Sequence, residues 1–124
     1  TGSPHYVRFV QDIEAVDVDA EGKAVRYSEP FQLNGINVNF VMETPQRLYV
    51  ATYERGVEGE TLSCGTGVTA AALAYARKTG IQGYAHIGVH TKGGPLEVKF
   101  HAGIEGFSEI WLCGPAEEVF SGVY

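Results

Sequence analysis

One segment, CGTGVTAAALAYARKTG at residues 64–80, carries the strongest helix signal in the chain. The helix is expected to begin at residue 66 or 67 and to end at Thr79. Arg77 and Lys78 fall in its last turn, and Gly80 follows where helices commonly end. Its central residues are small and apolar on nearly every side, whereas a surface helix shows a single apolar stripe. The segment therefore predicts a helix enclosed by other elements at close range.

Apolar or alternating runs on both sides of this helix are typical of β-strands. They lie at residues 4–10, 37–43, 47–54, 84–91, 96–101 and 107–112. Residues 44–46 and 92–95 indicate hairpin turns, residues 102–103 begin another turn, and residues 12–28 indicate a short helix or a loop. We therefore expect an α+β fold, in which a curled, mostly antiparallel sheet or barrel wraps around a central helix.

Composition limits the class of protein. The 124 residues are 44% hydrophobic and 19% charged, which fits one globular domain. The formal net charge of −6 argues against nucleic acid or anionic membranes as partners, because both require a basic patch. No apolar run reaches the roughly 18 residues of a transmembrane helix, and we expect no signal peptide. With only Cys64 and Cys113 available for a disulfide, we expect a cytoplasmic protein with free thiols.

Cys64, at the start of the predicted helix, is the strongest candidate for a reactive group. A helix N-terminus carries partial positive charge and favours the thiolate, which is the reactive form of cysteine. Gly65-Thr66-Gly67 offers backbone N–H groups that can hold a carboxylate or a phosphate. Glu54 and Glu60 are nearby carboxylates that can orient or deprotonate a thiol. Arg55 can bind a substrate carboxylate through two hydrogen bonds.

Each of these features also has a structural explanation. A lone cysteine is more often a small buried hydrophobic residue than a nucleophile, and glycine-rich loops are common at helix starts. Glu54 and Arg55 can form an exposed ion pair of little consequence. Cys113 follows an apolar pair in a predicted strand, so we expect it in the core.

The four histidines show no spacing that favours a metal site. His86 and His90 lie on one face of a predicted strand, about 13 Å apart by the strand rise, which is too far for one ion. We therefore expect no metal. His5 begins a strand and is read, by itself, as a structural residue at the edge of a possible cleft.

Several short motifs nevertheless occur together in a specific order. They are GSPH at 2–5, NVNF at 37–40, ERG at 54–56, ETLSCGTG at 60–67 and CGPA at 113–116. This series resembles the C-terminal half of diaminopimelate epimerase, and the resemblance covers nearly the whole chain. It implies two similar halves, each a curled sheet around a central helix, with the active site between them. Residues 1–124 would form one domain, and the N-terminal half, with its own Cys-Gly-Asn-Gly motif, would be absent.

The resemblance implies an isomerase that interconverts LL- and meso-diaminopimelate, a precursor of lysine and peptidoglycan, without pyridoxal phosphate, metal or other cofactor. Two cysteines on opposite faces of the α-carbon would exchange the roles of base and acid. Cys64 would supply one of them and the missing half the other. The isolated chain is then expected to be inactive, although a homodimer could mimic the two halves.

The resemblance also assigns roles to individual residues. The catalytic set is Cys64, Glu54 and His5, and the substrate-binding set is Ser3, Asn37, Glu54, Arg55, Gly65 and Thr66. Backbone N–H groups of Gly65 and Thr66 would bind the reacting α-carboxylate, and Asn37 and Arg55 would hold the distal carboxylate. The side chains of residues 5 and 54 would tune the protonation of the catalytic thiols.

The sequence departs from the family pattern in three places. Ser3 stands where the family usually has asparagine, residues 57–60 contain one extra residue, and Cys113 stands where threonine is common. A proline or hydroxyproline racemase-type isomerase on the same fold is an alternative. So is a noncatalytic binding module.

Overall fold

A computed structural model describes residues 5–28, 35–54, 57–61, 65–114 and 118–122. These residues form one eight-stranded sheet, in which β4 pairs with β3 beside the path β1-β2-β3-β5-β6-β7-β8. The strands are β1 (His5–Phe9), β2 (Asn37–Glu43), β3 (Leu48–Glu54), β4 (Gly59–Thr61), β5 (Gly83–Thr91), β6 (Gly94–Gly103), β7 (Gly106–Cys113) and β8 (Glu118–Gly122). The helices are the short η1 (Ile13–Ala15), α1 (Val18–Arg26) and α2 (Gly65–Thr79).

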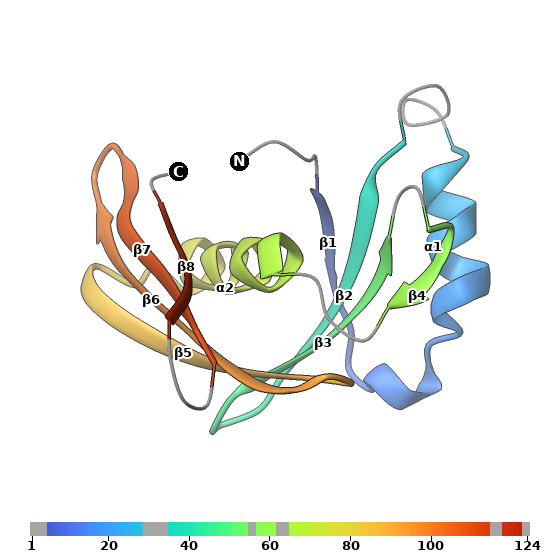
Figure 1. The fold of residues 1–124 in the computed structure, drawn as a ribbon, viewed down its shortest axis with the longest axis horizontal. Helices are drawn as coiled ribbons and strands as arrows, with labels where there is room; N and C mark the ends of the chain where they lie inside the picture. The colour runs from blue at the N-terminus through green and yellow to red at the C-terminus, as the bar shows by residue number, and fades with distance from the viewer. Residues whose placement is uncertain (1–4, 29–34, 55–56, 62–64, 115–117, 123–124) are drawn as a thin grey trace.

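The sheet is mixed but mostly antiparallel. β1 pairs with β2 and β3 pairs with β5 in parallel, and the other strand pairs are antiparallel. Figure 1 shows the sheet curling around α2, with its edge strands β1 and β8 on either side of the open side. This arrangement confirms the expected α+β fold with a central helix.

The small side chains of helix α2 allow it to lie close to the sheet. It packs against β1, β2, β3, β5, β6 and β7, and Val68, Ala71, Ala72 and Ala76 along it are completely buried. The helix is followed by Gly80 at φ +75°, a left-handed conformation that favours glycine. The predicted helix is thus confirmed, with its start one residue earlier than expected.

The opposite face of the sheet carries α1, in the region expected to be a short helix or a loop. The side chain of Asp17 caps α1 by accepting a hydrogen bond from the backbone N–H of Ala20. A Cβ at Gly22 would lie 2.4 Å from the Cβ of Tyr53, so only glycine allows this approach. Residues of β2 and β3 therefore alternate between an α2 face and an α1 face of the sheet.

Cys113 corrects the expectation of a buried core cysteine. It is half-buried, because the alternation along β7 directs Ile110 and Leu112 into the core and turns Trp111 and Cys113 toward the outer face. Trp111 is accordingly exposed. The outer face also carries His86, which pairs with Glu97 at 2.7 Å.

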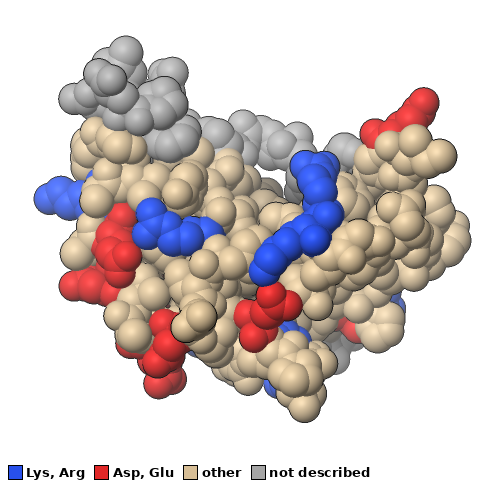
Figure 2. Space-filling view, turned by 180° about the vertical axis from the view of Figure 1, so that it is seen from behind, with Lys and Arg blue, Asp and Glu red and all other residues tan. Residues whose placement is uncertain are grey.

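Charged side chains of both signs lie on one face of the molecule. On the face shown in Figure 2, lysine and arginine side chains lie among aspartate and glutamate side chains and form no continuous basic patch. Across the parts of the chain that the structure describes, no helix combines the length and apolar character needed to cross a bilayer.

Candidate functional site

Three polar side chains line up where β1 and β2 begin and β3 ends. His5 is the register partner of Asn37 in the parallel pair β1–β2. Val38 pairs with Tyr53 in β2–β3, and continuing this register by one residue sets Asn37 beside Glu54. Because register partners share a face of a sheet, all three side chains belong to the α2 face. We call His5, Asn37 and Glu54 the strand-end row.

The N-terminus of α2 meets this row. Nε2 of His5 lies 3.1 Å from Oγ1 of Thr66, in the first turn of the helix. The first backbone N–H groups of an α-helix have no partner within the helix and carry its partial positive charge. The fold therefore brings a helix N-terminus, with its partial positive charge, next to the polar strand ends.

A glycine allows this close approach. A Cβ on Gly67 would lie 2.5 Å from Oδ1 of Asn39 and 3.5 Å from Oγ1 of Thr52. Asn39 and Thr52 are register partners on the α2 face, directly beneath the helix. A larger residue at position 67 would push the helix start away from the sheet.

Asn39 is a site residue that the sequence analysis missed. It is completely buried, and its side-chain amide is hydrogen-bonded on both ends. Oδ1 accepts from the hydroxyl of Thr52 at 2.9 Å. Nδ2 lies 3.2 Å from the carbonyl oxygen of Tyr6 and 3.2 Å from Nδ1 of His5. The signal was present in the run NVNF at 37–40, where Asn39 stands two residues after Asn37 and therefore on the same face.

Burial also affects the charge of His5. The ring is partly withdrawn from water between β2 and α2, and this desolvation lowers the pKa of His5 below its ordinary value of about 6.5. The imidazole is therefore neutral at pH 7. A neutral imidazole has one donor and one acceptor nitrogen, and both nitrogens here face a protein group.

The predicted site residues are only partly among those that the structure describes. His5, Asn37, Glu54, Gly65 and Thr66 are brought together at one end of the sheet. Ser3, Arg55 and Cys64 lie outside the described residues. In the sequence, Arg55 directly follows Glu54, and Cys64 directly precedes Gly65, the first residue of α2.

Glu60, the second carboxylate near Cys64 in the sequence, belongs to the opposite face of the sheet. It is the register partner of Tyr53 in β3–β4 and therefore shares the α1 face. Its carboxylate pairs with Nζ of Lys92 at 2.8 Å, and its backbone N–H donates to Asp19 at 2.9 Å. Of the two carboxylates, only Glu54 belongs to the face that carries α2.

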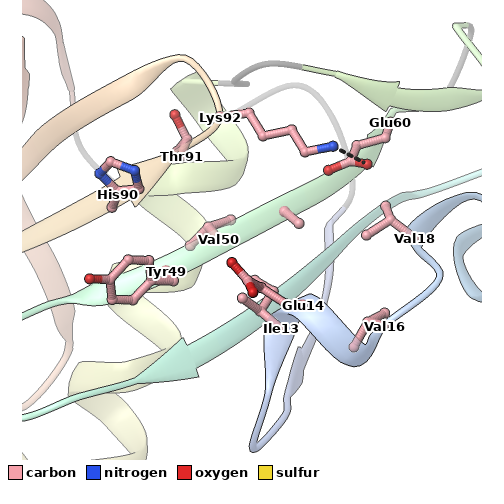
Figure 3. A pocket seen from close by; sticks show the side chains of 11 residues that line it. Ile13, Glu14, Val16, Val18, Tyr49, Val50, Glu60, His90, Thr91 and Lys92 are labelled. Carbon is pink, nitrogen blue, oxygen red and sulfur yellow. Dashed lines mark hydrogen bonds and ion pairs between the residues drawn. The ribbon is translucent and has the colours of Figure 1, made fainter.

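This ion pair lines one side of a pocket of about 430 Å³. Figure 3 shows the side chains that line the pocket. It is lined by Ile13, Glu14, Val16, Val18, Tyr49, Val50, Ala51, Glu60, His90, Thr91 and Lys92. The strand-end row and Thr66 are not among these residues, so this pocket is separate from the candidate site. Within the described ranges, no three histidine, cysteine, aspartate or glutamate side chains are grouped as metal ligands.

Segment 57–60, which contains one residue more than the family pattern, contacts the rest of the fold through Glu58. Glu58 has φ +57°, and its carboxylate accepts hydrogen bonds from the hydroxyls of Tyr27 at 2.9 Å and Tyr53 at 3.3 Å. Arg26 forms an ion pair with it at 3.2 Å. Its backbone N–H donates to the carbonyl of Glu54 at 2.8 Å. These contacts hold the segment that follows Glu54 against the C-terminal end of α1.

Comparison with known proteins shows a match to one family. The profile of the diaminopimelate epimerase family matches residues 1–117. The chain is 48% identical to diaminopimelate epimerase of Flavobacterium psychrophilum, over 97% of this chain and 47% of the relative. It is 47% identical to the enzyme of that name from Methanocella arvoryzae, over 98% of this chain and 41% of the relative. The chain thus spans about half the length of these relatives.

A solved structure shares the fold. The phenazine biosynthesis protein of the PhzF family from Bacillus anthracis superposes with a TM-score of 0.58 at 17% identity. The match covers 90% of this chain and 36% of that protein. At this identity the likeness concerns the fold alone.

Proposed function

Because this chain belongs to the diaminopimelate epimerase family, we propose that it forms the C-terminal half of an enzyme that interconverts LL- and meso-diaminopimelate. The observation that carries the proposal is the meeting of the strand-end row with the start of α2, where His5 contacts Thr66. The other half of the active site comes from the remaining length found in the relatives.

The chemistry requires two groups on opposite faces of one carbon. The α-proton of an amino acid is very weakly acidic, so a base must remove it while an acid delivers a proton to the other face. Cys64 is proposed for one face, as thiolate or thiol according to the direction of turnover. Its sulfur takes the α-proton as the C–H bond breaks, and a thiol of the other half protonates the opposite face. No cofactor takes part in this exchange.

The start of α2 stabilises the negative charge that develops on the substrate. In the proposal, the backbone N–H groups of Gly65 and Thr66 bind the reacting α-carboxylate. Removal of the α-proton moves charge onto these oxygens, and fixed N–H donors at a helix N-terminus favour that charge without reorganising. Cys64 precedes Gly65 directly, so the base and the carboxylate site come from consecutive residues.

Binding of the distal carboxylate selects the substrate. We assign this role to Arg55 and Asn37, with Ser3 as a further contact from the start of β1. Asn37 is buried in the strand-end row, and Arg55 directly follows Glu54 of that row in the sequence. A substrate without a second carboxylate, such as proline, leaves this cation unpaired.

Glu54 and His5 flank the start of α2 and are proposed to tune the protonation of the catalytic thiols. We place the reaction in the cytoplasm, because the mechanism needs thiols that stay reduced.

The test is epimerisation of LL-diaminopimelate by the full-length protein and by two matched cysteine variants. Cys64→Ser is expected to lower kcat by at least about 100-fold, the lower end of the range for losing an acid–base group. Cys113→Ser, on the outer face of β7, is expected to retain the activity of the unmodified protein. Racemisation of proline without epimerisation of diaminopimelate would overturn the substrate assignment. Equal activity of both variants would overturn the role of Cys64.

A further inference from the structure

The amide of Asn39 has one orientation that satisfies its neighbours. A backbone carbonyl can only accept hydrogen bonds, so the atom 3.2 Å from the oxygen of Tyr6 must be the NH₂ group. The same orientation turns Oδ1 toward the hydroxyl of Thr52, which donates to it at 2.9 Å. The opposite orientation would set two oxygens against each other inside the protein.

This orientation determines the hydrogen positions on His5. The second N–H of the Asn39 amide points to Nδ1 of His5 at 3.2 Å, so Nδ1 must offer a lone pair. A neutral imidazole carries one proton, which then resides on Nε2. Nε2 faces Oγ1 of Thr66 at 3.1 Å and donates to it.

We propose that Asn39 is a positioning residue, which holds His5 as the neutral Nε2–H tautomer and directs that N–H at the start of α2. The inference deepens the proposed function and rests on it for the consequence in catalysis. His5 then acts as a fixed hydrogen-bond donor and does not transfer protons itself. A proton added at Nδ1 would face the N–H of Asn39, and burial of the ring opposes the added charge as well.

Among the residues that the structure describes, the groups that contact the ring are uncharged. From β2, His5 faces the uncharged Asn37 and Asn39, and from α2 it faces the uncharged Thr66. Glu54 of β3 lies in the same row with Asn37 between them. The ring therefore has a neutral partner on each nitrogen.

The direct test observes the tautomer in the full-length protein labelled with ¹⁵N-histidine. Long-range ¹H–¹⁵N correlation distinguishes the protonated from the unprotonated ring nitrogen. His5 is expected to show an unprotonated Nδ1 and a protonated Nε2 at pH 7. A protonated Nδ1, or rapid averaging of the two tautomers, would overturn the inference. This spectrum is independent of the activity, so it stands even if the proposed substrate is wrong.

Two variants of the same buried network separate the role of Asn39 from general packing. Asn39→Asp offers Nδ1 an acceptor in place of a donor, and we expect the proton to move to Nδ1. Thr52→Val removes the other hydrogen bond of the amide but leaves the carbonyl of Tyr6, so the Nε2–H tautomer should persist. The same tautomer in both variants would overturn the inference. If Asn39→Asp fails to fold, the spectrum of the unmodified protein decides.

Kinetics of His5 variants test the donor role. The amide of glutamine can supply an N–H near the position of Nε2, whereas alanine cannot. We expect His5→Gln to retain kcat within about tenfold of the unmodified enzyme, and His5→Ala to lose more than that. If His5 were a general acid or base, both variants would lower kcat by about 100-fold or more. Equal losses of that size would contradict the donor role.

Discussion

Nε2 of His5 lies 3.1 Å from Oγ1 of Thr66, although the two residues are 61 positions apart in the chain. The contact joins the first strand of the sheet to the first turn of the enclosed helix. It defines one end of the fold as the place where strand-borne polar groups meet a helix N-terminus.

Removing the hydroxyl of Thr66 tests the contact itself. Thr66→Val keeps a β-branched side chain and the backbone N–H but cannot accept a hydrogen bond from His5. This hydrogen bond is partly buried, and a typical hydrogen bond contributes about 1 kcal/mol, so we expect kcat to fall roughly fivefold. The KM for diaminopimelate should change little, because the backbone N–H remains. Steady-state kinetics of the full-length protein provide the measurement, and a larger effect on KM than on kcat would argue against this reading.

Gly67→Ala should destabilise the fold. The added Cβ would lie 2.5 Å from Oδ1 of the completely buried Asn39, so the helix start or the amide must move. Overpacking of this kind costs about 1–3 kcal/mol in free energy of unfolding. Gly103→Ala is the matched control, because a Cβ there has its nearest neighbour at 3.7 Å. The packing described here would be contradicted if urea denaturation gave Gly103→Ala a lower free energy of unfolding than Gly67→Ala.

Glu58→Ala tests the anchor of the segment after Glu54. The substitution removes the acceptor of the Tyr27 and Tyr53 hydroxyls and leaves a non-glycine residue at φ +57°. We expect a loss of about 1–2 kcal/mol in free energy of unfolding and a raised KM for diaminopimelate. Glu105→Ala, at an exposed position, should leave both quantities near those of the unmodified protein. An unchanged KM would show that the anchor does not serve the site.

The pH dependence of stability should carry a contribution from His5. Burial lowers the pKa of His5 in the folded state, so the unfolded chain binds more protons as the pH falls through its ordinary value of about 6.5. Stability from this group is complete above that pH and is lost on acidification. We expect the free energy of unfolding of His5→Gln to fall less steeply between about pH 7.5 and pH 5 than that of the unmodified protein. Parallel curves would show that His5 does not titrate differently on folding.

The central helix could be predicted because its signals are local. The alanine run, the basic last turn and Gly80 all lie within residues 64–80, and each acts on the backbone nearby. The grouping of His5, Asn37 and Glu54 followed from a resemblance, and strand register then explains it physically.

Other features could not be read from the sequence because they depend on which face a side chain takes. Cys113 was wrongly expected in the core because a strand alternates faces, and only the pairing of β6 with β7 shows which face is inside. The face taken by Glu60 likewise follows only from the pairing of β4 with β3. Asn39 was missed for a related reason. Its importance arises from partners contributed by β1 and β3.

Exchange of the α-proton in D₂O tests the central claim that this chain supplies one of two acid–base faces. LL-diaminopimelate is incubated with the full-length protein, with its Cys64→Ser variant and with residues 1–124 alone, and loss of the α-proton signal is followed by NMR. We predict exchange by the full-length protein, at least about 100-fold slower exchange by the variant, and none by residues 1–124. Sustained exchange by a monomeric 124-residue chain, or undiminished exchange by Cys64→Ser, would contradict the account.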